Sequence, residues 1–414
     1  MDIVKKMPNE DIGAFLDIYM NAYPGEDIPL ENKEKTIERW KKTQTELPDV
    51  DFYGLYRDGQ LQGGMTIHDY TMNFSSKKIR VMGVGAVAVD LLYKKEKVCK
   101  EMISYFHKHC KDNGVYVSIL YPFRSDFYKK MGYGYGTKMN RYQFRPHNLP
   151  RGKSKSNIRY LQKEDTKTVL DCYNRYVERT HGMILRTERY IMRLIVNPKL
   201  KAVVYLKEGQ CYGYLVFKFE DAKKDNWILN NIVIHEFIYE NAEALAELST
   251  FLHTQDDQIH RIIFSTQEEN FHFLLKDPRN DSYHIFRTSQ ETNQQGIGLM
   301  YRVLDTEEFF KQLSDHNFSN QTCKLKLSIT DTFLPENHRS IIVHFENGKA
   351  KVKKDEFEVE ISLSVAEFSS LVMGVITFKE LYQYGLVKIS APTYVEIINN
   401  IFLAKEKPIC LTQF

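Results

Sequence analysis

The sequence lacks long apolar stretches. None of its segments approaches the roughly 18 consecutive apolar residues that a transmembrane helix requires. Residues 1–6, Met-Asp-Ile-Val-Lys-Lys, contain no hydrophobic core of a signal peptide. We therefore expect a cytoplasmic protein that does not associate with membranes.

The sequence also lacks the cysteine and histidine spacings of a disulfide or metal framework. Its cysteines are scattered without paired spacing, which indicates reduced and mostly buried thiols. They are Cys99, Cys110, Cys172, Cys211, Cys323 and Cys410. His107, His109 and Cys110 share one expected helix at spacings that do not converge on a metal, and His235-Glu236 lacks the second histidine of a zinc motif. No metal cofactor is expected.

A large excess of charge of one sign is missing as well. The 57 Lys and Arg nearly balance the 54 Asp and Glu, and the formal charge of +3 argues weakly against a dedicated nucleic-acid-binding protein. Apolar residues make up 43% and charged residues 27%, which is an ordinary globular mixture. A chain of 414 residues is long for a single core, so we expect two or three domains.

The most informative feature that is present is a strand that turns into a helix near residue 90. The apolar run that contains Val87, Ala88 and Val89 breaks into a basic turn with Lys94, Lys95 and Lys97. Apolar residues then recur at helical spacing at Val98, Met102, Ile103, Phe106 and Cys110, and Gly114 suits a left-handed cap. Residues 115–120 read as a second strand, parallel to the first.

Such a turn predicts a phosphate-binding site. The first backbone N–H groups of a helix have no partners within the helix, and they point toward one place. The three lysines add positive charge there, so the pyrophosphate of coenzyme A would meet both backbone dipoles and ammonium groups. The alternative is an ordinary solvated helix start, which is the commoner explanation of an isolated basic turn.

The chain repeats this outline with the opposite charge. Residues 233–253 follow the same strand-to-helix pattern at a constant offset, with Tyr239 in the place of Tyr93. Glu240, Asn241 and Glu243 then take the places of the three lysines. We expect a doubled fold that binds phosphate in its first copy and repels it in the second.

The rest of the chain divides at its breaks. Amphipathic helices are expected at 11–23 and 33–45, and a linker-like segment spans 146–156. The second unit follows, and the third begins near Leu299 with strands at 324–330, 341–345, 349–353 and 357–362 and a final helix at 394–402. The pattern predicts an α/β (α+β) protein.

Several motifs, in this order, resemble those of the enhanced intracellular survival (Eis) acetyltransferases, members of the GNAT superfamily. They are the Val-Ala-Val strand with its basic turn, Leu120-Tyr121-Pro122, Phe127 to Gly134, Asp277-Pro278-Arg279, Gly298 to Val303, Ile329-Thr330-Asp331 with Asn337, and a C-terminal Phe414. The resemblance spans nearly the whole chain. It implies an N-terminal GNAT domain that binds acetyl-CoA (1–148), a second GNAT-like domain without cofactor (149–298) and a sterol-carrier-like domain (299–414), assembled as a homohexamer.

One departure concerns the phosphate turn. The superfamily pattern reads Arg or Gln, two residues, Gly, one residue, then Gly or Ala; here Lys94 holds the first position, Lys97 the first glycine position and Cys99 the second. Glycine lets the backbone approach a pyrophosphate without a Cβ in the way. Lys97 could still offer its N–H with its side chain outward, but a weak or degenerate coenzyme site is the alternative. The candidate coenzyme-binding residues are Val87, Ala88, Val89, Lys94, Lys95, Glu96, Lys97, Val98, Cys99 and Lys100.

Acetyl transfer needs an oxyanion donor, an acid and a base. Backbone groups of residues 87–89 suit the first task if this strand separates from its neighbour. Tyr128 matches the general acid of the similar enzymes, although a packed aromatic on a short helix is the ordinary role of such a residue. The resemblance also implies that the terminal carboxylate, that of Phe414, is the base, and the apolar residues 408–411 before it favour docking of the chain end.

The resemblance suggests an acceptor amine of the polyamine, aminoglycoside or lysine type. Glu26, Asp27, Glu31 and Glu34 carry the charge to attract such cations, although a solvated face is the commoner role of such acids. A different class of function is a degenerate acetyltransferase that binds a lipid or another apolar ligand in its third domain. The alternating apolar residues at 325–329 and 359–363 serve equally well as plain core, which is the interpretation we favour.

Overall fold

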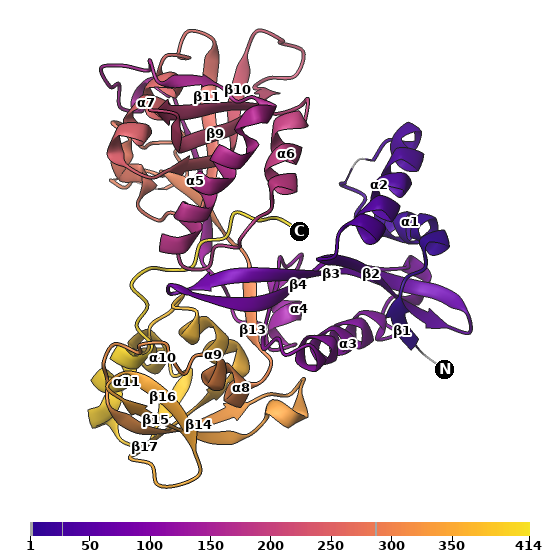
Figure 1. Cartoon of the computed structure of the whole chain (residues 1–414), viewed down its shortest axis with the longest axis vertical. Coiled ribbons are helices and arrows are strands. Elements are labelled where there is room, and N and C mark those ends of the chain that lie inside the picture. Colours follow the sequence, from indigo (N-terminus) through magenta and orange to yellow (C-terminus); the bar gives the residue numbers. More distant parts are fainter. Residues whose placement is uncertain (1–2, 27, 286–287) are drawn as a thin grey trace.

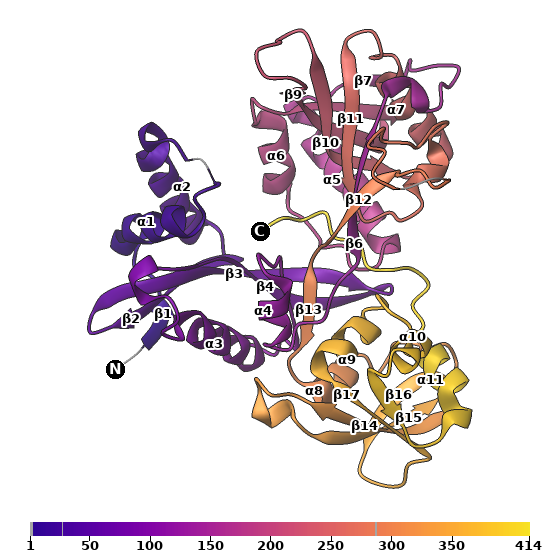
Figure 2. The ribbon, with the colours of Figure 1, turned by 180° about the vertical axis from the view of Figure 1, so that it is seen from behind.

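The computed structural model describes residues 3–26, 28–285 and 288–414. Three β-sheets with their helices form three lobes (Figures 1 and 2). The C-terminal segment leaves the third lobe, passes below the second and ends beside the first. The α/β class predicted from the sequence is confirmed.

The first lobe has a six-stranded mixed sheet. Its order is β1 (Ile3–Lys6), β2 (Val50–Arg57), β3 (Gln60–Phe74), β4 (Lys77–Val89), β5 (Val117–Leu120) and β13 (Met300–Val303). Its helices are η1 (Asn9–Asp11), α1 (Ile12–Ala22), η2 (Leu30–Asn32), α2 (Lys33–Glu46), η3 (Leu91–Tyr93), α3 (Val98–Asp112) and α4 (Ser125–Lys129). α1 and α2 cover one face and α3 the other (Figure 1).

The helices of this lobe follow the apolar periodicity of the sequence. The five apolar residues that predicted α3 are all buried, and Gly114 ends the helix in the left-handed region at φ 69°. The helices expected at 11–23 and 33–45 are α1 and α2. These predictions are confirmed.

The second lobe has a seven-stranded sheet. From one edge to the other it contains β12 (Asn293–Ile297), β6 (Lys138–Phe144), β11 (Ile259–Thr266), β10 (Asn230–Tyr239), β9 (Gln210–Asp221), β8 (Lys201–Lys207) and β7 (Ile158–Tyr160). Its helices are η4 (Pro146–Asn148), η5 (Lys163–Asp165), α5 (Thr166–Arg179), α6 (Glu188–Val196), α7 (Ala242–His253) and η6 (Phe271–Leu274). α5 and α6 pack on one face of the sheet and α7 on the other.

The first two lobes exchange strands. β6 precedes the linker in sequence but lies in the second sheet between β12 and β11, whereas β13 follows the second lobe and closes the first sheet against β5. The sheets therefore do not follow the domain boundaries 1–148, 149–298 and 299–414, which stay a sequence prediction. The exchange ties the two lobes together through their backbones.

The third lobe has a five-stranded sheet in the order β16 (Lys349–Lys353), β15 (Ser340–Glu346), β14 (Cys323–Thr330), β17 (Val359–Ser364) and β18 (Val387–Ile389). Its helices are α8 (Thr306–Gln312), η7 (Pro335–Asn337), α9 (Val365–Val372), α10 (Phe378–Gln383), η8 (Pro392–Tyr394) and α11 (Val395–Ile401). The alternating apolar residues of β14 and β17 are buried in one core with residues of β5 and β13, which confirms the interpretation as core.

A buried junction joins the lobes. Asn73 of β3 donates to the carbonyls of Val177, Glu178 and Thr180, and the ring of His181 lies against the carbonyls of Asn73 and Met373. Within the described parts of the chain, no helix has the length and apolar character that crossing a bilayer demands. Among those residues, no group of His, Cys, Asp and Glu is arranged to hold a metal ion.

Candidate active site

β4 and β5 separate where the sequence places the acyl site. The two strands are registered only at Met82 with Ser118 and at Gly83 with Ile119. A bulge follows in β4, where Ala86 has φ 47° and the register against β3 shifts. Residues 87–89 therefore run on without β5 as a neighbour, as the oxyanion role requires. On this stretch the carbonyl of Val87 accepts a hydrogen bond from the hydroxyl of Tyr23, at 2.7 Å.

A turn of residues 90–97 joins β4 to α3. Asp90 caps η3 by accepting from the backbone of Leu92, and the chain then turns through Lys95 and Lys97, which have φ 68° and 65°. Lys97 is the N-cap of α3, and its side chain makes no capping hydrogen bond. The first N–H groups of α3 thus have no acceptor within the helix. Lysine occupies a left-handed position that glycine would favour.

The turn and the first turn of α3 contain acids as well as lysines. Lys94, Lys95 and Lys97 are exposed, but Glu96 lies against Arg57, which also pairs with Glu101 at 2.9 Å. Arg57 thereby neutralises the acid among the predicted coenzyme-binding residues. The net field at the start of α3 is positive.

The second lobe has no such turn. Only Glu240 and Asn241 separate β10 from α7, whereas residues 90–97 separate β4 from α3. The constant offset between the repeats is therefore wrong in the turn, and Glu243 lies inside α7 rather than in a loop. Asn241 caps α7 through the backbone of Ala244, and Glu240 pairs with Arg175 at 2.6 Å. A shorter connection and a capped helix leave no phosphate cradle there.

Tyr128 lies on α4 and is buried among aromatic rings. The rings of Phe123, Phe127 and Tyr133 have their centroids 5.3 to 6.0 Å from its own. Burial raises the pKa of Tyr128 far above its usual value, and the nearby Cys99 adds to the shift. The phenol is therefore neutral at physiological pH. Its hydroxyl makes no hydrogen bond with residues 3–26, 28–285 and 288–414.

Tyr23 lies near Tyr128 and Cys99, although the sequence did not single it out. Besides its bond to Val87, burial raises the pKa of Tyr23 to about 12. Burial likewise raises the pKa of Cys99 to about 12. Two neutral phenols and a neutral thiol thus surround the separated end of β4 in a water-poor environment.

The last residue of the chain lies on the first sheet. The ring of Phe414 has its centroid 5.3 Å from that of His68, 5.5 Å from that of Tyr70 and 5.4 Å from that of Tyr121. A Cβ at Gly83 would come within 2.6 Å of this ring, and a Cβ at Gly85 within 2.9 Å of the terminal carboxyl carbon. The terminal carboxyl thus lies beside β4, two residues before Val87.

A chain of polar groups runs beside this carboxyl. Thr66 Oγ1 lies 3.0 Å from His68 Nε2, and the hydroxyl of Tyr70 lies 3.1 Å from His68 Nδ1. Thr66 Oγ1 is also 3.1 Å from the position of a Cβ on Gly85, so Thr66 and the carboxyl of Phe414 both lie against Gly85. Burial lowers the pKa of His68 to about 4, and the imidazole is neutral at pH 7.

A cavity of about 610 Å³ opens beside the chain end, between the first two lobes. Its lining includes His68, Tyr70, Arg186, Gln413 and the carboxylates of Glu46, Asp49 and Asp69. Acids of the early loop do not contribute: the described Glu26, Glu31 and Glu34 are exposed and are not among the lining residues. Asp27, the fourth acid suggested by the sequence, is outside the described residues.

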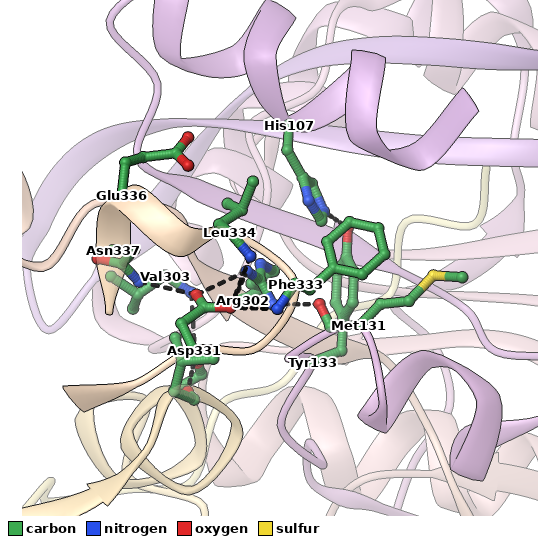
Figure 3. Close-up of polar contacts among 12 residues, drawn as sticks. His107, Met131, Tyr133, Arg302, Val303, Asp331, Phe333, Leu334, Glu336 and Asn337 are labelled. Atoms are coloured by element: carbon green, nitrogen blue, oxygen red, sulfur yellow. Dashed lines mark hydrogen bonds and ion pairs between the residues drawn. The ribbon is translucent and has the colours of Figure 1, made fainter. Parts of the chain in front are cut away.

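An ion pair between β13 and the third lobe supports the segment that carries Tyr128. Arg302 and Asp331 are fully buried and joined by two bonds of 2.9 and 2.7 Å. Figure 3 shows the guanidinium of Arg302 between Asp331 and the Met131 carbonyl, to which it donates. His107 and Tyr133, whose side chains are bonded at 3.0 Å, lie near this ion pair (Figure 3). The backbone N–H groups of Met131 and Tyr133 in turn bind the Tyr128 carbonyl.

Comparisons with known proteins assign all three regions. Residues 4–136 and 182–303 each match a family described as "Acetyltransferase (GNAT) domain", and residues 306–411 match "Sterol carrier protein domain". No curated protein matches the chain significantly.

Solved structures share the fold over the whole length of both chains. A probable N-acyltransferase from Enterococcus faecalis is 18% identical with a TM-score of 0.82, and a GCN5-related N-acetyltransferase from Anabaena variabilis is 17% identical with a TM-score of 0.81. Eis1 from Mycobacterium abscessus is 17% identical with a TM-score of 0.77. In each comparison the alignment covers 100% of both chains.

Proposed function

Because two of its domains are GNAT acetyltransferase domains and its last is a sterol carrier protein domain, the chain is an acyltransferase, and we propose that it transfers acetyl from acetyl-CoA to a primary amine. The single observation that carries the proposal is the terminal carboxyl of Phe414 beside β4, at the separated strands. That arrangement brings a base to the place where the fold exposes backbone groups for an acyl carbonyl.

The residues at the start of α3 fit the pyrophosphate of coenzyme A. The free N–H groups of the first turn and the lysines at 94, 95 and 97 supply donors and positive charge. Acetyl-CoA, when bound, supplies an acetyl thioester with a good leaving group. The second lobe, with its short and capped turn, is proposed to bind none.

Three groups of this chain would then share the chemistry. Backbone N–H groups of residues 87–89 donate to the acyl oxygen as negative charge develops there. Tyr128, whose phenol stays protonated because of burial, donates a proton to the departing thiolate. The carboxylate of Phe414 accepts the proton of the attacking amine, directly or through one water, and His68 and Tyr70 both contact the ring of Phe414 and line the cavity.

The cavity beside Phe414 is the proposed acceptor site. Asp69 pairs with Arg80 and Glu46 with Arg189, which leaves Asp49 as the lining acid for a cationic amine, in a cavity that Arg193 also lines. A polyamine, an aminoglycoside or a lysine side chain presents a suitable group. A screen of acetyl transfer against such amines would select among them.

Extending the chain beyond Phe414 tests the proposed base. One added Gly-Ser-Gly segment moves the carboxylate away and keeps every side chain. We expect turnover to fall by about a hundredfold to ten-thousandfold, the range for loss of an acid–base group, with acetyl-CoA affinity unchanged by calorimetry. The same segment at the N-terminus is the control. Normal turnover in the C-terminally extended protein would place the base elsewhere.

The resemblance to the Eis family further suggests a homohexamer, and the cytoplasmic location stays a sequence prediction. Sedimentation velocity of the purified chain tests the assembly, because a monomer of 48.8 kDa and a hexamer separate clearly.

A further inference from the structure

The last residues of the chain are held mainly by the second lobe. The backbone N–H of Ile409 donates to the His181 carbonyl at 2.8 Å, and that of Cys410 donates to Gln267 Oε1 at 2.6 Å. The side chains of Ile409 and Leu411 pack against the core between α5, α6 and the second sheet. Figures 1 and 2 show the segment passing below this lobe before it reaches the first.

Arg186 makes the central contacts to this segment. Its Nη2 donates to the carbonyl of Leu411 at 2.8 Å, and its Nε donates to Thr412 Oγ1 at 3.1 Å. The remaining nitrogen, Nη1, donates to Glu236 Oε1 at 2.7 Å, and Glu236 also accepts from the hydroxyl of Tyr214. One planar guanidinium thus binds two successive residues of the tail and a buried carboxylate at once.

The surroundings fix the orientation of this guanidinium. The side chains of Arg186 and Glu236 are each only 1% exposed, so their pairing is not weakened by water. The rings of Tyr173 and Tyr190 lie on the guanidinium at 4.2 and 3.9 Å. Arg186 therefore presents Nε and Nη2 in one direction, toward residues 411 and 412.

The first lobe binds the last residues of the C-terminal segment. The hydroxyl of Tyr121 donates to the Thr412 carbonyl at 3.1 Å, and the ring of Phe414 fills the space left by Gly83. Between Thr412 and Phe414 only the exposed Gln413 intervenes. The terminal carboxyl is thus held both by the contacts of residues 411 and 412 and by the ring of Phe414.

We propose that Arg186, oriented by Glu236, is a positioning residue that holds the C-terminal segment so that the carboxylate of Phe414 reaches the acyl site of the first lobe. The inference rests on the proposed function for its effect on turnover, but not for its effect on the tail. It gives the second GNAT domain, which has no phosphate turn, a task in the reaction.

Release of the terminal residue tests the anchor without reference to catalysis. Arg186→Lys keeps the charge opposite Glu236 but cannot reach three acceptors, and Thr412→Val removes only the Oγ1 acceptor. A carboxypeptidase that prefers aromatic C-terminal residues should release Phe414 at least about tenfold faster from both variants than from the native chain. Arg175→Lys is the control, because Arg175 also joins a carboxylate, Glu240, and a carbonyl in this lobe without touching the tail. Equal release from all four proteins overturns the inference.

Measurements of turnover distinguish the positioning role of Arg186 from the proposed role of the Phe414 carboxylate as the base. We expect Arg186→Lys and Thr412→Val to lower kcat by about tenfold to a hundredfold, the effect of misplacing a reacting group by about 1 Å, with acetyl-CoA affinity unchanged. Deletion of Phe414 is measured alongside. If the deletion leaves turnover intact while Phe414 is released faster from Arg186→Lys, the anchor stands and the proposed base falls. If the deletion abolishes turnover while Arg186→Lys is protected and fully active, the anchor falls and the proposed base stands.

Discussion

Two glycines of β4 leave the space that the last residue of the chain occupies. Gly83 and Gly85 lie inside a strand, where glycine is normally unfavourable because it packs no side chain. In the sequence, Gly83-Val84-Gly85 matches a dinucleotide motif only loosely, since continued strand follows it. The structure agrees with a strand interior and adds the physical reason for both glycines, which is the close approach of Phe414.

Gly85→Ala should therefore displace the chain end. Its Cβ would lie 2.9 Å from the carboxyl carbon, so either the tail or β4 must shift. We expect turnover to fall at least about tenfold and the free energy of unfolding to fall by about 1–3 kcal/mol, as for overpacking. Acetyl-CoA affinity should be retained. Gly296→Ala, where a Cβ meets no atom within 4 Å, is the control, and equal turnover in the two variants would contradict the proposed approach.

Tyr128 combines burial with a hydroxyl that has no recorded partner among the described residues. Tyr128→Phe keeps the ring packing against Phe123 and Phe127 and removes only the proton donor. We expect kcat to fall by about a hundredfold to ten-thousandfold with nearly unchanged coenzyme affinity. If the Tyr128→Phe variant has wild-type turnover, Tyr128 is not the acid and serves only in packing. Tyr142→Phe, in the second lobe, is the matched control.

At the scale of elements, the connection from strand to helix distinguishes the two GNAT domains. In the first, residues 90–97 form η3 and a turn with two left-handed lysines, and α3 starts without a side-chain cap. In the second, two residues suffice and Asn241 caps the helix. Loop length and capping, and not only the sign of charge, therefore distinguish the two helix starts.

The lysines of the first turn should carry part of the affinity for coenzyme. We expect Lys94→Glu combined with Lys95→Glu to weaken acetyl-CoA binding at least about tenfold, with a smaller difference at high salt, because exposed charges are screened. Calorimetry should find one site per chain in the native protein. Lys223→Glu combined with Lys224→Glu, two exposed neighbours in the second lobe, should leave affinity unchanged. Equal affinity in both double variants would remove the turn from the binding site.

The sequence predicted helices and strands well, but it predicted contacts between residues far apart in the sequence poorly. The periodicity of α3 and the alternation in β14 and β17 specify local structure, and both predictions hold. The exchange of β6 and β13 has no local signature, because a strand reads the same in either sheet. Tyr23, Thr66, His68 and Arg186 also escaped notice, since their roles arise only when segments far apart in sequence meet. A signal was available for Gly85, because a glycine inside a strand often marks the close approach of another part of the chain.

At the scale of the whole molecule, buried and half-buried histidines lie at the contacts between lobes. His181 lies against carbonyls of the first and third lobes, and the ring of His316 in the third lobe packs on Phe74 of β3, with centroids 5.6 Å apart. His107 of α3 packs against Phe333 of the third lobe at 5.4 Å. Burial lowers the pKa of each, to about 4 for His316. All three are neutral in the folded protein at pH 7.

Mild acid should therefore destabilise the contacts between the lobes and lower the free energy of unfolding. In the unfolded chain a histidine binds its proton near pH 6.5, whereas in the folded chain the lowered pKa resists binding. Below pH 6.5 the unfolded state holds more protons, so the free energy of unfolding decreases as the pH falls from about 6.5 toward 4. Each histidine contributes at most about 1.4 kcal/mol for each unit by which its pKa is lowered. Denaturant unfolding at pH 7, 6 and 5 measures this slope.

His316→Phe isolates one such contribution. The His316 ring makes only ring contacts, with Phe74 and Phe318, among the interactions recorded for the described residues, so phenylalanine can keep the packing and remove the titration. We expect the variant to lose less stability than the native chain between pH 7 and 5, with little change at pH 7. His338→Gln, at an exposed position, should leave the slope as it is. If His316→Phe shows the native slope, protonation at this contact does not govern acid stability, and other histidines with a lowered pKa, such as His68, His107 and His181, would have to account for it.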